Sequence, residues 1–300
     1  MAKIGRFKSD RARAAYMSAY DEMAALSPIP YTECDVETSF GTTHVHTFGA
    51  GPGTPLVLLH PLGGNGLCWY PVIEELSRDR VVYTLDTIGT AGRSVQTAPI
   101  TEQAQFGTWL DEVLAGLDTN RAHVLGYSDG GWHASMAGFH NAKRLASLTV
   151  IEPGGVVVKL RWSALFQIMK FAIVPSTKNM TRMNKWVMPG VPISEVEMRA
   201  AKASLGYQRH LPWGTVFEDT DLQSITIPSL WIFGGESEIC HPAEVAGQRV
   251  RTNVAQAEVE VYAGLGHGLF FANTEIVVPR ILEFLRRHDG SARSGTTDLG

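Results

Sequence analysis

Residues 122–131, AHVLGYSDGG, place a short apolar run directly before a serine that lies between two glycines. The run has the length and composition of a buried strand, and residues 130–141 have the spacing of a helix. With 30 glycines in 300 residues, the pattern G-x-S-x-G is weak on its own. Its position at a strand-to-helix turn is what makes Ser128 a candidate nucleophile.

The same alternation of strand and helix continues along the chain. Brief apolar strands are predicted at 55–60, 80–86, 122–127, 147–152, 229–234 and 257–263, with helices between them at 67–77, 102–117, 130–141, 243–251 and 274–288. Strands that are apolar throughout are typical of a parallel sheet covered on both faces. We therefore expect an α/β, doubly wound fold, with a mostly parallel central sheet and helices on both faces.

Two regions lie outside this regular alternation. Residues 1–30 are predicted to form an N-terminal helical extension with a helix over 10–26, followed by a hairpin that turns at Gly41. A gap of about 75 residues between two core strands is too long for a loop, so 156–215 is predicted to be a helical cap. Its helices are expected at 161–172, 177–187 and 194–205; the core then comprises 31–155 and 216–288, and 289–300 is expected to be a disordered tail.

Composition narrows the class of partner. A net charge of −4 gives no indication of nucleic-acid binding, which leaves small molecules as the expected partners. No uncharged apolar stretch reaches the roughly 18 residues of a membrane span, and the three cysteines are too scattered for a disulfide framework or a metal site. We expect a soluble cytoplasmic protein with no cofactor; the sequence leaves its oligomeric state open.

Over about residues 36–288 the chain resembles the α/β-hydrolase superfamily, specifically its serine-dependent, esterase-like branch. GYSDGG resembles the nucleophile elbow of that family, and LLHPLGGN resembles its H-G-x-x-G loop. By this resemblance the backbone N–H groups of Leu62 and Asp129 form the oxyanion hole. Pro61 stands where the family usually has glycine.

Two further motifs carry the resemblance. GGESEICHP is similar to the family's G-x-x-D-x-x-x-P segment, which puts Glu238 in the position of the acid, four residues before Pro242, with Glu236 as the alternative. GLGHGLF follows the last strand, where the family has its histidine, and supplies His267. The chain order of serine, acid and histidine is the order of this fold.

The resemblance implies acyl transfer through a Ser128–His267–Glu238 triad. The leading prediction is a serine hydrolase that cleaves an ester, thioester or lactone of a small apolar acyl substrate through an acyl-enzyme. The same residues could serve acyl transfer or cyclisation, carbon–carbon hydrolysis or perhydrolysis, and the fold does not choose among them. A non-catalytic binding module on this scaffold would show a broken triad, which the sequence does not.

The cap carries the candidate substrate-binding residues, which are large and apolar: Trp162, Phe166, Met169, Met183 and Trp186. Between Pro153 and Ser194 there are six Lys or Arg residues and no Asp or Glu. As a group the large residues predict an apolar acyl pocket, although packing of the cap onto the core explains any single one of them. A solvated helix face explains the cations; the alternative is a rim that attracts an anionic or carrier-linked substrate.

Two other groups of polar residues are predicted to be structural. Asp86 lies in a turn that resembles a family motif but carries one extra residue. His44 and His46 share one face of a strand, but no third ligand lies near them in sequence, so no metal site is expected. His60 and His133 are expected to pack or hydrogen-bond.

Overall fold

A computed structural model describes residues 3–173 and 176–290 of the chain. The predicted tail at 289–300 lies almost entirely outside the described residues. None of the helices in the described ranges is long and apolar enough to cross a membrane.

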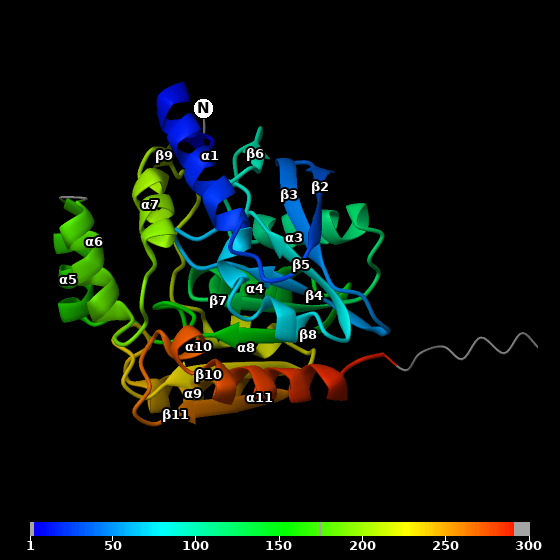
Figure 1. Cartoon of the computed structure of the whole chain (residues 1–300). Helices are drawn as coiled ribbons and strands as arrows, with labels where there is room; N and C mark the ends of the chain where they lie inside the picture. The colour runs from blue at the N-terminus through cyan, green and yellow to red at the C-terminus, as the bar shows by residue number, and fades with distance from the viewer. Residues whose placement is uncertain (1–2, 174–175, 291–300) are drawn as a thin grey trace, which may run out of the picture.

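The centre of the molecule is a nine-stranded sheet (Figure 1). Its main path runs, in spatial order, through β11 (Ala257–Tyr262), β10 (Ser229–Gly234), β8 (Leu145–Ile151), β7 (Ala122–Tyr127), β4 (Gly53–Leu59), β5 (Arg80–Leu85), β3 (Gly41–Phe48) and β2 (Tyr31–Thr38). The short β6 (Val95–Gln96) pairs with β3. All pairs from β11 to β5 are parallel, whereas β3 runs antiparallel to β2, β5 and β6. The predicted α/β fold with a mostly parallel sheet is confirmed.

Helices cover both faces of this sheet because each face has its own apolar core. One core is covered by α3 (Gln105–Gly116), α4 (Asp129–His140), α8 (Asp219–Ser224) and α9 (Ala243–Asn253). The other is covered by η1 (Gly66–Trp69), α2 (Ile73–Leu76), α10 (Leu269–Ala272) and α11 (Thr274–Arg287). The single helix predicted over 67–77 is wrong: it is divided into η1 and α2, since Pro71 cannot donate a backbone hydrogen bond there.

The segment 156–215, predicted to be a cap and called so below, contains in its described part the helices α5 (Trp162–Ile173), α6 (Thr177–Val187) and α7 (Glu195–Ser204), close to the predicted positions. α7 begins with a capping box, in which the side chains of Ser194 and Glu197 each accept the other's backbone N–H. The N-terminal helix α1 (Asp10–Ala24) packs along α7, and β1 (Arg6–Phe7) pairs with β9 (Tyr207–Gln208). The N-terminal segment therefore holds the cap, while α5 and α6 lie at the outer edge of the molecule (Figure 1).

Candidate active site

Ser128 occupies a strained turn between β7 and α4. Its φ is +56°, a left-handed conformation that costs a non-glycine residue about 1–3 kcal/mol. The two flanking glycines make the turn possible, because a Cβ at Gly126 would lie 2.0 Å from the Gly130 carbonyl oxygen and a Cβ at Gly130 would lie 1.9 Å from the Leu59 carbonyl oxygen. The sequence therefore builds the sharp elbow that presents a side chain at the carboxyl edge of the sheet.

His267 lies in the loop between β11 and α10 and faces this serine. Its Nε2 is 3.1 Å from Ser128 Oγ. Tyr127, at the end of β7, fixes the histidine: its hydroxyl donates to the His267 carbonyl oxygen at 2.8 Å, and the two rings stack with centroids 5.4 Å apart. The predicted pairing of Ser128 with His267 is present in the geometry.

The acid that contacts this histidine is Glu152, which replaces the predicted Glu238. Glu152 Oε2 lies 2.7 Å from His267 Nδ1. Glu152 is the first residue after β8, the strand next to β7, and its carboxylate is completely buried. Like Ser128 it adopts a left-handed conformation, with φ of +49°. Strain of this kind in a non-glycine residue is a recognised mark of functional positions.

The buried carboxylate of Glu152 accepts several hydrogen bonds. Oε1 accepts the backbone N–H of Gly234 at 2.6 Å, and Oε2 accepts the hydroxyl of Ser237. Burial, and after it the nearby charge of Glu152, raises the pKa of the Cys240 thiol well above its usual value. Cys240 is therefore held as a neutral thiol, which donates to the Pro153 carbonyl oxygen.

The two acids favoured by the sequence motif lie elsewhere. Glu236 is exposed and Glu238 is half-buried, and within the described residues neither has a hydrogen bond or ion pair with His267. The motif segment still contributes to the site, since Ser237 lies between these two glutamates and donates to Glu152. The signal in the sequence was a single glutamate directly after a buried strand and before Pro153 and two glycines.

The loop after β4 lies beside the elbow because β4 pairs with β7, with Leu59 opposite Gly126. His60 holds this loop: its Nε2 accepts the N–H of Thr87 at 3.2 Å, which leaves Nδ1 to donate to the Pro61 carbonyl oxygen. Leu62 follows with an exposed side chain. Asp129 is the first residue of α4, where a helix has no internal acceptor for its N–H.

Arg209, just after β9, reaches the side chain of Asp129. Its Nη2 lies 3.4 Å from Asp129 Oδ2, and its guanidinium lies over the Trp213 ring, 4.4 Å from the centroid. Nε and Nη1 of this arginine are buried and have no hydrogen-bond partner in the part of the chain that the structure describes. A cation whose donors are only partly satisfied therefore lies beside the residue that follows Ser128.

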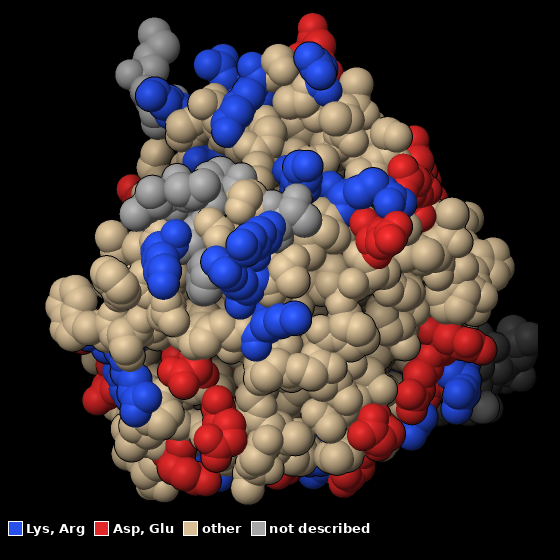
Figure 2. Space-filling view, turned by 60° about the vertical axis from the view of Figure 1, so that its left-hand side comes forward, with Lys and Arg blue, Asp and Glu red and all other residues tan. Residues whose placement is uncertain are grey.

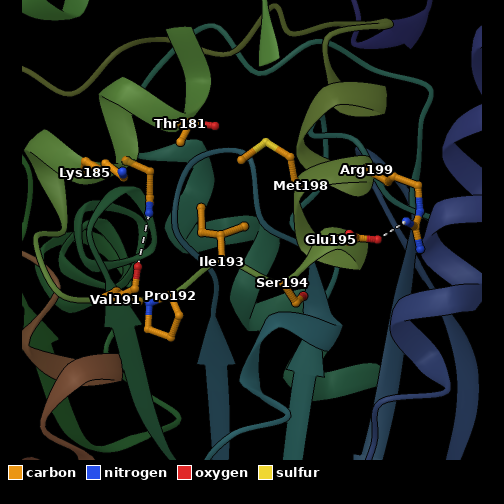
Figure 3. Close-up of a pocket in the computed structure, with 10 residues that line it drawn as sticks. Thr181, Lys185, Val191, Pro192, Ile193, Ser194, Glu195, Met198 and Arg199 are labelled. Carbon is orange, nitrogen blue, oxygen red and sulfur yellow. Dashed lines mark hydrogen bonds and ion pairs between the residues drawn. The ribbon is translucent and has the colours of Figure 1, made fainter. Parts of the chain in front are cut away.

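The candidate substrate-binding residues of the cap differ in how far they are exposed. Trp162, Phe166 and Met169 are 79%, 68% and 52% exposed, Met183 is 37% exposed, and Trp186 is half-buried against the core. A cavity of about 510 Å³ between α6 and α7 is lined instead by other residues (Figure 3): Thr181, Asn184, Lys185, Val191, Pro192, Ile193, Ser194, Glu195, Met198 and Arg199. The exposure of Trp162, Phe166 and Met169 gives no support for a pocket at α5, and the substrate-binding role of the five residues stays a prediction.

The two strand histidines acquire a third neighbour that sequence spacing could not show. β2 places Glu33 opposite His46, and the ligand atoms of Glu33, His44 and His46 lie within 4.8 Å of one another. Glu33 is already paired with Arg93 at 2.8 Å, and His46 Nε2 lies 3.0 Å from the hydroxyl of Tyr20. The group therefore forms a polar network in which most members are satisfied without an ion.

Asp86 belongs to the same region and organises its loops. Its carboxylate accepts the backbone N–H groups of Gly66 and Arg93 and the hydroxyl of Tyr20, at 2.7 to 2.9 Å. A Cβ at Gly92 would lie 2.6 Å from one of its oxygens. These contacts agree with the structural role expected for this turn.

The family model of the alpha/beta hydrolase family matches residues 56–280. The chain belongs to the alpha/beta hydrolase family. Carboxylesterase YbfK of Bacillus subtilis is 28% identical over 280 residues, which cover 90% of this chain and 93% of the relative. Its crystal structure, as carboxylesterase CesB, has a TM-score of 0.84 over 92% of this chain and 98% of that one. The uncharacterized carboxylesterase nap of the same organism is 25% identical over 93% of this chain and 94% of the relative. These similarities place this alpha/beta hydrolase among the hydrolase enzymes.

Proposed function

We propose that the protein is a serine hydrolase that cleaves a carboxylic ester through Ser128, His267 and Glu152. One observation carries this proposal: a continuous chain of hydrogen bonds joins the buried carboxylate to the imidazole at 2.7 Å and the imidazole to the serine at 3.1 Å. Two relatives named as carboxylesterases support the choice of an ester as substrate and water as acceptor.

The order of events follows from this geometry. His267 Nε2 takes the proton of Ser128 Oγ as the oxygen attacks the ester carbonyl, and a tetrahedral intermediate forms. Glu152 keeps the Nδ1 proton on the far side of the ring, so that Nε2 is free to accept, and its charge stabilises the imidazolium. The imidazolium then gives its proton to the departing alcohol, which leaves the acyl group on Ser128 Oγ. In the second half of the reaction His267 takes a proton from water as the water attacks the acyl-enzyme, and it returns that proton to Ser128 Oγ as the carboxylic acid leaves.

The developing oxyanion needs donors, and we assign them to the backbone N–H groups of Leu62 and Asp129. The pairing of β4 with β7 and the free N–H at the start of α4 support this assignment. Each such donor contributes about 3–4 kcal/mol to transition-state stabilisation in related chemistry.

The acyl group is proposed to be apolar and larger than acetyl. Two small or apolar residues near the serine support this: a Cβ at Gly154 would lie 3.9 Å from Ser128 Oγ and 3.4 Å from Ile239 Cγ2. The end of α6 reaches the histidine loop as well, since a Cβ at Gly268 would lie 2.9 Å from Met188 Cβ. Activity on p-nitrophenyl esters from acetyl to decanoyl should therefore peak beyond acetyl; an optimum at acetyl would contradict an apolar acyl site.

An anionic group elsewhere on the substrate is proposed to improve kcat/KM. The unsatisfied Nε and Nη1 of Arg209, beside Asp129, support this part of the proposal, because buried donors without partners favour an anion. Arg209→Gln should reduce kcat/KM for a hemisuccinate ester more than for its neutral methyl-capped analogue. Equal reductions for both esters would remove the anionic group from the proposal.

A fluorophosphonate probe tests the central assignment directly. It should label the protein with one equivalent, and peptide mass spectrometry should find the adduct on Ser128. An unlabelled protein that also leaves esters, thioesters and lactones intact would contradict a hydrolase that uses this serine.

A further inference from the structure

Helix α5 exposes a stripe of large apolar side chains to solvent. Trp162, Leu165, Phe166 and Met169 are 79%, 37%, 68% and 52% exposed. Their spacing of three, four and seven residues places them on one face of the helix. The inward face of α5 carries Ala164, which is fully buried, and Ile168, which packs against the core. The stripe is therefore not needed to hold the cap on the protein.

Six cations accompany this stripe on α5, on α6 and just before α5. All six are exposed, and none of them has an ion-pair partner within the described residues: Lys159, Arg161, Lys170, Lys178, Arg182 and Lys185. The sequence has no Asp or Glu between Pro153 and Ser194. Lys and Arg side chains gather in the upper and central part of this face of the molecule, with acidic side chains to the right of them and below them (Figure 2). The local charge is thus opposite in sign to the net charge of −4.

The combination of an apolar stripe and unpaired cations decides what kind of partner fits. A second copy of the chain would bring six cations against six others, so self-association through this face is opposed by charge. Helices that lie in a lipid–water interface have this composition, with Trp, Phe and Leu on the apolar side and Lys or Arg beside them. Lys and Arg stems can also lie along apolar surface while their charges reach lipid phosphates.

We propose that the pair of helices α5 and α6 binds the surface of an anionic lipid bilayer. The four apolar side chains of α5 enter the interface, and the six cations contact the phosphate headgroups. This binding does not depend on the ester hydrolysis proposed above, since within the described residues no hydrogen bond or ion pair joins any of these ten side chains to Ser128, Glu152 or His267.

Binding is measured by sedimentation of the whole protein with vesicles. Vesicles of diether phosphatidylglycerol contain no carboxylic ester bond, so the proposed hydrolysis cannot disturb the measurement, and diether phosphatidylcholine serves as the neutral surface. We expect binding to the anionic vesicles at 50 mM salt, at least tenfold weaker binding to the neutral ones, and loss of binding as salt rises.

Two variants remove the two components of the surface separately. Lys178→Gln/Arg182→Gln/Lys185→Gln removes three charges and should weaken binding about 100-fold, at about fivefold for each cation near an anionic surface. Its control, Arg78→Gln/Lys143→Gln/Arg251→Gln, removes three exposed cations outside the cap and should bind like the wild type. Trp162→Ala/Phe166→Ala should weaken binding at least tenfold, whereas Trp213→Ala, which removes a 66% exposed tryptophan outside α5 and α6, should not.

The exposure of the substituted side chains means that these variants should fold, which their thermal unfolding verifies. Absence of binding to the anionic vesicles would overturn the proposal, as would equal weakening by the two triple variants. Self-association that is lost in Trp162→Ala/Phe166→Ala would assign the stripe to a second copy instead. Capture of an acidic protein without any vesicle binding would assign the surface to a protein partner and equally overturn the proposal.

Discussion

Replacing Glu152 by glutamine tests the assignment of the acid with almost no change in side-chain volume. Each carboxylate oxygen has its own donors in the structure: the Gly234 N–H on Oε1, and the Ser237 hydroxyl and His267 Nδ1 on Oε2. A glutamine has one oxygen and one NH₂ group, so one of these two sets of donors must face an NH₂ group.

Both orientations of the glutamine disturb the site. If the NH₂ group takes the Oε2 position, His267 must present a bare Nδ1 to it and carry its proton on Nε2, which cannot then accept from Ser128. If the NH₂ group takes the Oε1 position, it faces the backbone N–H of Gly234, which in the wild type lies 2.6 Å from the carboxylate oxygen. Two donors then oppose each other and the hydrogen bond is lost. The first orientation costs about 10⁴-fold in kcat when an acid of a triad becomes an amide, which is about 5 kcal/mol.

The assay is ester hydrolysis under saturating substrate, with thermal unfolding as a measure of folding. We expect Glu152→Gln to lose three to four orders of magnitude in kcat, and Glu238→Gln and Glu236→Gln to stay within a few-fold of the wild type. A large loss in Glu238→Gln together with an active Glu152→Gln would refute the reasoning, because the hydrogen bond at His267 would then have no catalytic consequence.

Three further outcomes are expected. Ser128→Ala should fold normally, lose at least about 10³-fold in kcat and take up no fluorophosphonate label. Tyr127→Phe leaves the buried carbonyl oxygen of His267 without its donor, and should lower the free energy of unfolding in urea by about 1–3 kcal/mol. Burial lowers the pKa of His133 to about 4, so between pH 6.5 and 4 the unfolded chain binds a proton that the folded protein does not, and stability falls as the pH falls through this window. The free energy of unfolding should change less steeply with pH in His133→Leu, by up to about 1.4 kcal/mol per pH unit. A substitution of the exposed His140 should leave this dependence on pH unchanged.

The sheet, the elbow and the histidine loop could be predicted because each is encoded locally. Strands buried on both faces are apolar throughout, and the glycines at 126 and 130 are required by contacts that any side chain would violate. The histidine follows the last core strand, so its place in the chain order and its place in the fold agree. The hydrogen bond between Ser128 and His267 is the geometric result of these local features.

The acid could not be predicted by the same reasoning. The motif after β10 matched in spacing, but whether a carboxylate reaches His267 depends on which strand end lies against the histidine loop, and sequence spacing does not contain that information. The exposure of the cap residues could not be predicted for a related reason. Large apolar residues with helical spacing predict an apolar face, but not whether that face turns inward, and on α5 it turns outward.

The register of the sheet explains why Ser128 and Glu152 can share one histidine. β7 and β8 are parallel, and Tyr127 lies opposite Ile151, so Ser128 and Glu152 are the first residues beyond the paired strands at the same edge. The N–H of Ser128 donates to the Ile151 carbonyl oxygen at 2.9 Å, which links the two strand ends directly. Both residues then turn into left-handed conformations, a combined cost of about 2–6 kcal/mol that two glycines would avoid. Only a serine and a glutamate at these positions supply the hydroxyl and the carboxylate on either side of His267, which is why we attribute the strain to the chemistry of the site and not to the needs of the fold.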